Sequence, residues 1–121
     1  MLGSLLRGDI CDVEFTNQDK ESHIQNGKRP CIIISNNKNN LFSPVVTVIP
    51  LTTSKSKSQI PTHVLIKKNK DNRLLDHSTA LCESVCPVEK KYVSTYSIGK
   101  LDASTMRQIE KAINIHLGMT G

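Results

Sequence analysis

Aromatic residues are scarce in this sequence, and its middle contains no acidic residue. The 121 residues include no Trp, two Tyr and two Phe. Because aromatic side chains are few, few bases could stack on them. A protein that binds single-stranded nucleic acid mainly by base stacking is therefore disfavoured. No uninterrupted apolar stretch approaches the roughly 20 residues needed to cross a bilayer. The apolar residues 1–6 are too few for the core of a signal peptide. We therefore expect a cytoplasmic protein that does not contact the membrane.

The length predicts a single domain over residues 1–121, large enough to bury a hydrophobic core without disulfides or metal ions. Its four cysteines, Cys11, Cys31, Cys82 and Cys86, show no pairing at the spacing of zinc ligands. We expect them to be reduced thiols, and we expect no metal site.

Positive charge is concentrated in one segment. The formal net charge is +5, yet no acidic residue lies between Ser22 and Lys70, where the cations are Lys28, Arg29, Lys38, Lys55, Lys57, Lys67, Lys68 and Lys70. Such a concentration is typical of a surface that binds a polyanion. On charge alone, a solvated basic face explains it equally well.

Apolar alternation and β-branched runs predict strands over residues 9–15, 31–35, 43–53, 61–66, 78–85 and 92–98. Within the third, Pro50 predicts a bulge or an edge. Polar residues 16–28 predict a long exposed loop, and the four Asn of residues 36–40 predict a turn. Residues 102–117 show helical spacing, with Asp102 or Ser104 as N-cap and Gly118 as the stop. The expected fold is a small antiparallel β-barrel closed by a C-terminal helix.

Two sets of polar residues lie at the ends of apolar strands. Arg29 lies between the polar loop and a strand, where a guanidinium suits a bidentate grip on phosphate. Residues 52–54 offer hydroxyls and amides where the third strand ends. Arg29 could equally pair with a carboxylate, and residues 52–54 could simply end the strand. His63 and His116 are interpreted as structural residues, His116 in the core or at an interface.

Several short motifs occur in an order and spacing that resemble the MazF/PemK family of bacterial toxins, over residues 7–117. They are Arg7-Gly8-Asp9-Ile10, Gln25-Asn26-Gly27-Lys28-Arg29-Pro30, Ser35-Asn36-Asn37, Asn40, Phe42-Ser43-Pro44, and Thr52 nine residues before Pro61-Thr62-His63-Val64. The resemblance implies an SH3-like β-barrel, a homodimer and a ribonuclease that needs neither metal nor other cofactor. It also implies cleavage of single-stranded RNA at short sequences, leaving 2′,3′-cyclic phosphate and 5′-hydroxyl ends.

The resemblance also implies roles for individual residues. The family's catalytic Arg and Thr fall on Arg29 and Thr52, and Glu83 falls where some members carry an acidic residue that could serve as general base. The RNA 2′-hydroxyl would be the nucleophile, with Arg29 stabilising charge on the phosphorane. The residues expected to bind substrate are Gln25, Lys28, Asn36, Thr53, Ser54, Lys55 and Lys57.

One departure from the family pattern concerns a charge near the site. Many relatives carry Arg-Thr-Ile-Asp after the acidic residue, whereas this chain has Cys86-Pro87-Val88-Glu89. The loop over residues 16–28 is also about two residues longer than in close relatives, and we expect it to gate the groove. Cleavage preference is therefore expected to differ.

The resemblance implies partners as well. A cognate antitoxin with a disordered acidic C-terminal segment would occupy the RNA groove and cover Arg29 and Thr52. Operator DNA would be contacted only through that antitoxin. The C-terminal helix and strand edges would form the homodimer.

Two alternatives stay open. A toxin of the same fold could poison DNA gyrase by binding it through the C-terminal helix, without catalysis. An RNA-binding module that has lost its activity is the other.

Overall fold

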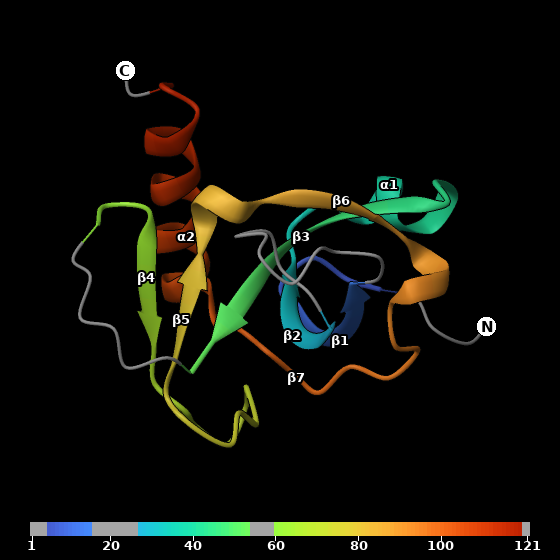
Figure 1. The fold of residues 1–121 in the computed structure, drawn as a ribbon, viewed down its shortest axis with the longest axis horizontal. Helices are drawn as coiled ribbons and strands as arrows, with labels where there is room; N and C mark the ends of the chain where they lie inside the picture. Colours follow the sequence, from blue (N-terminus) through green and yellow to red (C-terminus); the bar gives the residue numbers. More distant parts are fainter. Residues whose placement is uncertain (1–4, 16–26, 54–59, 120–121) are drawn as a thin grey trace.

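The computed structural model describes residues 5–15, 27–53 and 60–119. Their strands pair antiparallel in the order β4-β5-β3-β2-β1-β7, with β6 also paired to β3 (Figure 1). The elements are β1 (Asp9–Phe15), β2 (Gly27–Ile33), α1 (Asn37–Phe42), β3 (Val45–Thr52), β4 (His63–Ile66), β5 (Ser78–Leu81), the 3-10 turn η1 (Cys82–Ser84), β6 (Cys86–Glu89), the 3-10 turn η2 (Lys90–Tyr92), β7 (Gly99–Lys100) and α2 (Ala103–His116). The predicted antiparallel β-barrel fold with a C-terminal helix is confirmed, and the mostly antiparallel sheet forms a half-barrel.

The sheet separates two hydrophobic clusters. Successive side chains of a strand point to opposite faces, so Ile32 joins one cluster while its neighbours Cys31 and Ile33 join the other. The first cluster lies under α2, which contributes Met106 and Ile109. In the view of Figure 1, α2 lies behind β5. The strand predicted over residues 31–35 runs instead over Gly27–Ile33, so it begins four residues earlier and ends two residues earlier than predicted. Its residues 31–33 are buried on both faces, as the β-branched run indicates.

The C-terminal helix confirms its predicted boundaries and caps. Asp102 accepts a hydrogen bond from the Thr105 backbone N–H at 2.7 Å, which satisfies a donor that the first turn leaves free. Gly118 follows the helix at a φ of +70°, a conformation that favours glycine. At the exposed end of the helix, His116 lies outside the core, so its assignment to the core is wrong.

Arg7 joins the helix to the barrel. Its backbone N–H donates to Asn37 Oδ1 at 2.7 Å, its Nε donates to the Ile34 carbonyl at 2.9 Å, and its guanidinium pairs with Glu110 at 2.9 Å. Arg7 thus links the residue after β2, α1 and α2 through its backbone and its side chain together.

The third strand is central, so the expectation that Pro50 marks an edge is wrong. β3 pairs with β2 on one side; on the other it pairs with β6 through Val48 and then with β5 from Leu51 onward. Pro50 is fully buried between these two pairings. A residue without an N–H is tolerated there because the strand is changing partners.

Three other expectations need correction. Residues 36–40 do not form a simple turn: Asn36 caps α1 by accepting from the Asn39 N–H at 2.8 Å, and the buried Asn40 donates to the Ser35 carbonyl at 2.8 Å. The strand predicted over 78–85 ends at Leu81, because the chain turns into η1. Residues 92–98 form no strand, since only Val93 is buried there and it makes a single bridge to Val13.

No helix within the described residues is long and apolar enough to cross a membrane. The interpretation of residues 16–28 as a gating loop concerns mostly residues outside the described part.

Candidate active site

Arg29 and Thr52 lie on the same face of neighbouring strands. Cys31 pairs with Pro50 at the end of the β2–β3 ladder. Arg29 and Thr52 each lie two residues beyond that pair, so alternation directs both to the face of Cys31 and Pro50. Past this point β2 stays paired with β1, and β3 continues beside β5 (Figure 1). Both side chains are partly exposed at this end of the sheet.

The same face continues across β5 and β4. Thr52 pairs with Thr79, Thr79 with Leu65, and Leu81 with His63. We call the face formed by Thr52, Thr79, Leu65, Leu81 and His63 the open face, since α2 covers its opposite side. It is hydroxyl-rich next to Thr52, and Leu65 is 60% exposed on it.

The open face carries an acid–imidazole pair that the sequence alone did not indicate. His63 Nε2 lies 2.8 Å from Glu83 Oε2, and the two side chains are 16% and 35% exposed. The sequence interpretation set His63 aside as structural. Alternation could have found it, because His63 and Leu65 occupy the face opposite the apolar Val64 and Ile66.

Glu83 is held in its charged form. Burial raises the pKa of its carboxyl, but hydrogen bonds from His63 and from the backbone, together with the charge of His63, bring the pKa below its ordinary value of 4.5. Glu83 Oε1 is buried without a hydrogen-bond partner, so this carboxylate retains acceptor capacity. The carboxyl of Glu83 is therefore ionised at neutral pH.

The structure brings together only part of the predicted site. Arg29 and Thr52 share a face, while His63 lies on β4, two strand spacings or roughly 10 Å from β3. Glu83 lies on η1, and its carboxylate contacts His63. Lys28 and Thr53 are exposed beside Arg29 and Thr52. Asn36 is not part of this arrangement, because it follows the far end of β2 and its side chain caps α1. Outside the described residues lie Gln25, Ser54, Lys55 and Lys57.

The four cysteines are free thiols, as expected. Burial raises the pKa of Cys11 to about 11 and that of Cys82 to about 12, and it also raises the pKa of Cys31 and of Cys86. Protonated thiols are poor nucleophiles. Cys86 packs half-buried against the second cluster, so no charge lies at this position. Within the described ranges, no group of three or more His, Cys, Asp or Glu could hold a metal ion.

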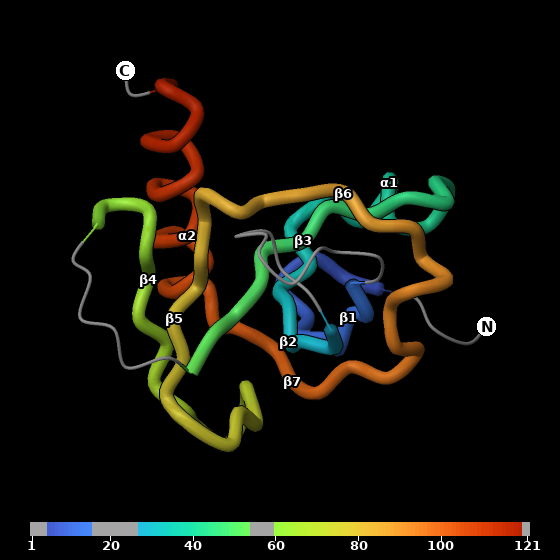
Figure 2. Tube along the Cα trace, viewed as in Figure 1, coloured from blue at the N-terminus to red at the C-terminus, as the bar shows by residue number. Residues whose placement is uncertain are grey.

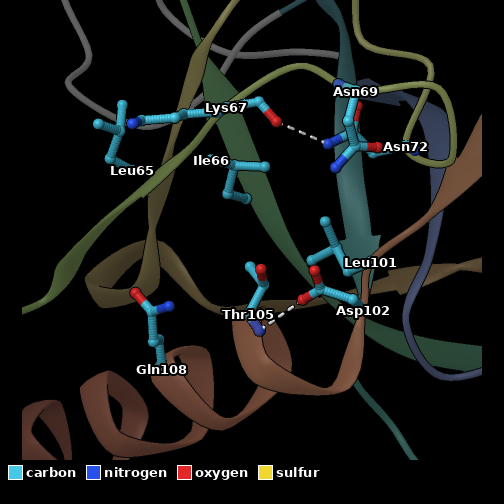
Figure 3. A pocket seen from close by; sticks show the side chains of 9 residues that line it. All are labelled: Leu65, Ile66, Lys67, Asn69, Asn72, Leu101, Asp102, Thr105 and Gln108. Atoms are coloured by element: carbon cyan, nitrogen blue, oxygen red, sulfur yellow. Dashed lines mark hydrogen bonds between the residues drawn. The ribbon is translucent and has the colours of Figure 1, made fainter.

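A hollow of about 290 Å³ lies at the edge strand β4, between its end, residues 69–72 and the start of α2, and Leu65 and Lys67 also line it (Figure 3). Its polar groups already have structural roles. Asp102 caps α2, and Asn72 Nδ2 donates to the Lys67 carbonyl at 2.9 Å. It is therefore not a candidate active site.

The half-barrel and its helix define a class of small β-barrel protein whose solved structures include toxins. The fold matches a MazF crystal structure from Deinococcus radiodurans with a TM-score of 0.80, at 19% identity over 96% of this chain and 98% of that one. It also matches an endoribonuclease in complex with its cognate antitoxin from a mycobacterial species, with a TM-score of 0.77, at 24% identity over 97% and 98% of the two chains.

Sequence comparison gives the family. Residues 6–117 match the PemK-like, MazF-like toxins of type II toxin-antitoxin systems. The chain is also 37% identical over 113 residues to the endoribonuclease MazF of Staphylococcus epidermidis, covering 93% of this chain and 91% of that protein. The chain therefore belongs to the PemK/MazF toxin family, which confirms the resemblance noted in its motifs.

Proposed function

We propose that this chain is a toxin that cleaves single-stranded RNA at short sequences without a metal, through attack of the RNA 2′-hydroxyl. Family membership and the 37% identity to a protein named endoribonuclease MazF support the ribonuclease activity. The observation that carries the site is the single face shared by Arg29, Thr52 and the His63–Glu83 pair.

Arg29 and Thr52 hold the scissile phosphate. The guanidinium faces the phosphate oxygens, where it stabilises the charge that develops on the phosphorane, and the Thr52 hydroxyl is a further donor. A guanidinium with a pKa above about 12 is a poor acid at neutral pH, so its role is electrostatic. Lys28 adds positive charge beside Arg29, and the Thr53 amide contributes to holding the substrate.

The His63–Glu83 pair handles the proton of the 2′-hydroxyl. With Nε2 bonded to the carboxylate, the neutral imidazole carries its proton there and leaves Nδ1 as an acceptor. Because its pKa is low, Glu83 is a weak base by itself and serves mainly to orient His63. The roughly 10 Å between β3 and β4 accommodates the ribose and phosphate. As the 2′-oxygen bonds to phosphorus, the bond from phosphorus to the 5′-oxygen breaks, and the leaving 5′-oxygen takes up a proton from solvent. The products are a 2′,3′-cyclic phosphate and a 5′-hydroxyl, and the step uses no metal.

The same surface suits regulation by an antitoxin. A solved relative is an endoribonuclease in complex with its cognate antitoxin. We propose that a disordered acidic antitoxin segment occupies the open face and covers Arg29 and Thr52, that operator DNA is bound only through the antitoxin, and that the toxin is a homodimer. Four free cysteines fit the reducing cytoplasm.

The decisive experiment is cleavage of a long synthetic RNA in EDTA by the wild-type protein and by Arg29→Ala. We expect cuts at a recurring short motif with cyclic phosphate ends, and a loss of about 10²–10³ in rate or more for Arg29→Ala. Lys38→Ala is the matched control, because Lys38 is an exposed cation on α1, away from the site.

Either of two results contradicts the proposal. Equal cleavage by Arg29→Ala and the wild type would remove Arg29 from the mechanism. If the RNA stays intact although the wild-type protein is folded, the nuclease activity is excluded. The result would then favour a toxin that binds gyrase or an RNA-binding protein without catalytic activity.

A further inference from the structure

Residues 67–77 join β4 to β5 at the end of the sheet where β3 also ends (Figure 2). The segment has four exposed cations and two exposed carboxylates, Asp71 and Asp76. None of the cations takes part in an ion pair within the described residues. We call them the basic turn: Lys67, Lys68, Lys70 and Arg73.

The backbone of the basic turn is fixed. Asn72, only 1% exposed, accepts hydrogen bonds from the Asn69 and Leu74 N–H groups at 3.0 Å each. The Lys100 N–H donates to the Asp71 carbonyl at 3.0 Å. Gly99 packs so closely that a Cβ there would lie 2.3 Å from the Asn72 carbonyl oxygen. The cations are therefore carried on a rigid support, which lowers the entropy lost when they bind a partner.

The basic turn continues the open face. Thr52, Thr79 and Leu65 form a row across three strands, and Lys67 follows Leu65 by two residues. In Figure 3 the Lys67 side chain extends toward Leu65 and away from Asn72. A chain held at Thr52 therefore crosses hydroxyls and an exposed leucine over roughly 10 Å, and about 7 Å farther along the chain it reaches Lys67. Within the described residues Lys67 forms no ion pair.

We infer that the basic turn is a second RNA subsite, which binds backbone phosphates flanking the cleaved bond. This inference rests on the proposed function, because the path of the RNA chain is taken to start at the phosphate held by Arg29 and Thr52. A nucleotide chain fits it, since its phosphates repeat while its bases need an apolar surface such as Leu65. Phosphate contacts of this kind are sequence-independent and weaken with salt.

The test compares two variants that lose the same charge. One carries Lys67→Gln, Lys68→Gln and Lys70→Gln; the control carries Lys38→Gln, Arg107→Gln and Lys111→Gln, exposed cations of α1 and α2. Binding to a 2′-O-methyl RNA of about 20 nucleotides and to one of about five is measured by fluorescence anisotropy between about 50 and 200 mM salt. Cleavage of unmodified RNAs of the same lengths is measured in parallel.

For the turn variant we expect weaker binding of the long RNA and a log–log salt dependence less steep by about 2, from three lost phosphate contacts. Binding and cleavage of the short RNA stay at the wild-type level. The control variant keeps most of the wild-type salt dependence. Equal effects of the two variants, or an unchanged affinity of the turn variant for long RNA, would overturn the inference.

Two further results separate the possible failures. A variant that keeps its affinity for RNA but loses binding to polyglutamate would assign the turn to an acidic peptide and overturn the RNA subsite. Because the 2′-O-methyl RNA cannot be cleaved, its binding reports on the subsite even when the unmodified RNA stays intact. Intact unmodified RNA together with normal binding of the 2′-O-methyl RNA would contradict the proposed nuclease activity and leave the RNA subsite supported.

Discussion

The two faces of the β3–β5–β4 part of the sheet are built from alternate residues of the same strands, yet they differ in every property. On one face Leu51, Ala80 and Val64 are buried under α2. On the other face, Thr52 and His63 are partly exposed, Thr52 beside Arg29 and His63 in contact with Glu83. Because neighbours in the sequence belong to opposite faces, stability and catalysis can be changed at adjacent positions with separate outcomes.

The strongest challenge to this separation is a pair of adjacent substitutions. Leu51 is 1% exposed, so Leu51→Ala should lower the free energy of unfolding by about 2–5 kcal/mol. Thr52→Val keeps the side-chain volume and should change stability by about 1 kcal/mol or less, while cleavage falls about 10²-fold or more. Urea unfolding and RNA cleavage are measured on both variants. A large stability loss in Thr52→Val would show that the faces are not independent.

Gly99→Ala tests whether the turn beside the open face depends on close packing like that of the core. A Cβ at this position would meet the Asn72 carbonyl oxygen at 2.3 Å, so β7 or the turn must shift. We expect a loss of about 1–3 kcal/mol in the free energy of unfolding. Thermal unfolding gives the result, and an unchanged melting temperature would argue against the rigid turn.

Asp102→Ala probes the covered face alone. Losing the cap on the Thr105 N–H should destabilise the protein by about 0.5–2 kcal/mol and leave RNA cleavage by the folded protein unchanged. Asp102→Asn is the matched control, since Asn caps helices about as well as Asp. Chemical unfolding of the three proteins distinguishes the lost cap from the lost charge.

The smallest expected effect belongs to the open face and depends on pH. The pKa of Glu83 is lower in the folded protein than its ordinary 4.5, so its stabilisation is complete above that value and is lost as the pH falls through the lowered pKa. Compared with Glu83→Gln, the wild-type advantage in unfolding free energy should shrink from pH 7 toward pH 3. Since the carboxylate is 35% exposed, solvent screening keeps this advantage small. A difference independent of pH would contradict the assignment.

The sequence predicted most of the strands and the helix, because alternation and capping are local signals. Where tertiary contacts decided the structure, prediction failed. Asn-rich residues 37–42 are helical because Asn36 caps them and Asn40 is buried on Ser35. Pro50 lies in a central strand because β3 exchanges one partner for another there. Neither contact is visible as a pattern in the sequence.

For the candidate site, the sequence supplied Arg29, Thr52 and Glu83 through family motifs. Their spatial arrangement had to come from the strand pairing, and so did the position of His63 on the same face. The Asn36 position remains a prediction as a substrate contact, although within this chain its side chain caps a helix far from Arg29. Motifs thus identify residues, whereas register decides which of them can act on one substrate.

The short strand β5 has a consequence for how this protein can change over evolutionary time. Ser78 and Ala80 point into the covered side, while Thr79 and Leu81 point to the open one. Substitutions at Thr79 or at the opposite Leu65 leave the core packing intact, so the protein stays stable enough to fold. Under the RNA path proposed above, a lineage can therefore explore new RNA preferences at these positions through many small steps, each of which keeps a folded toxin.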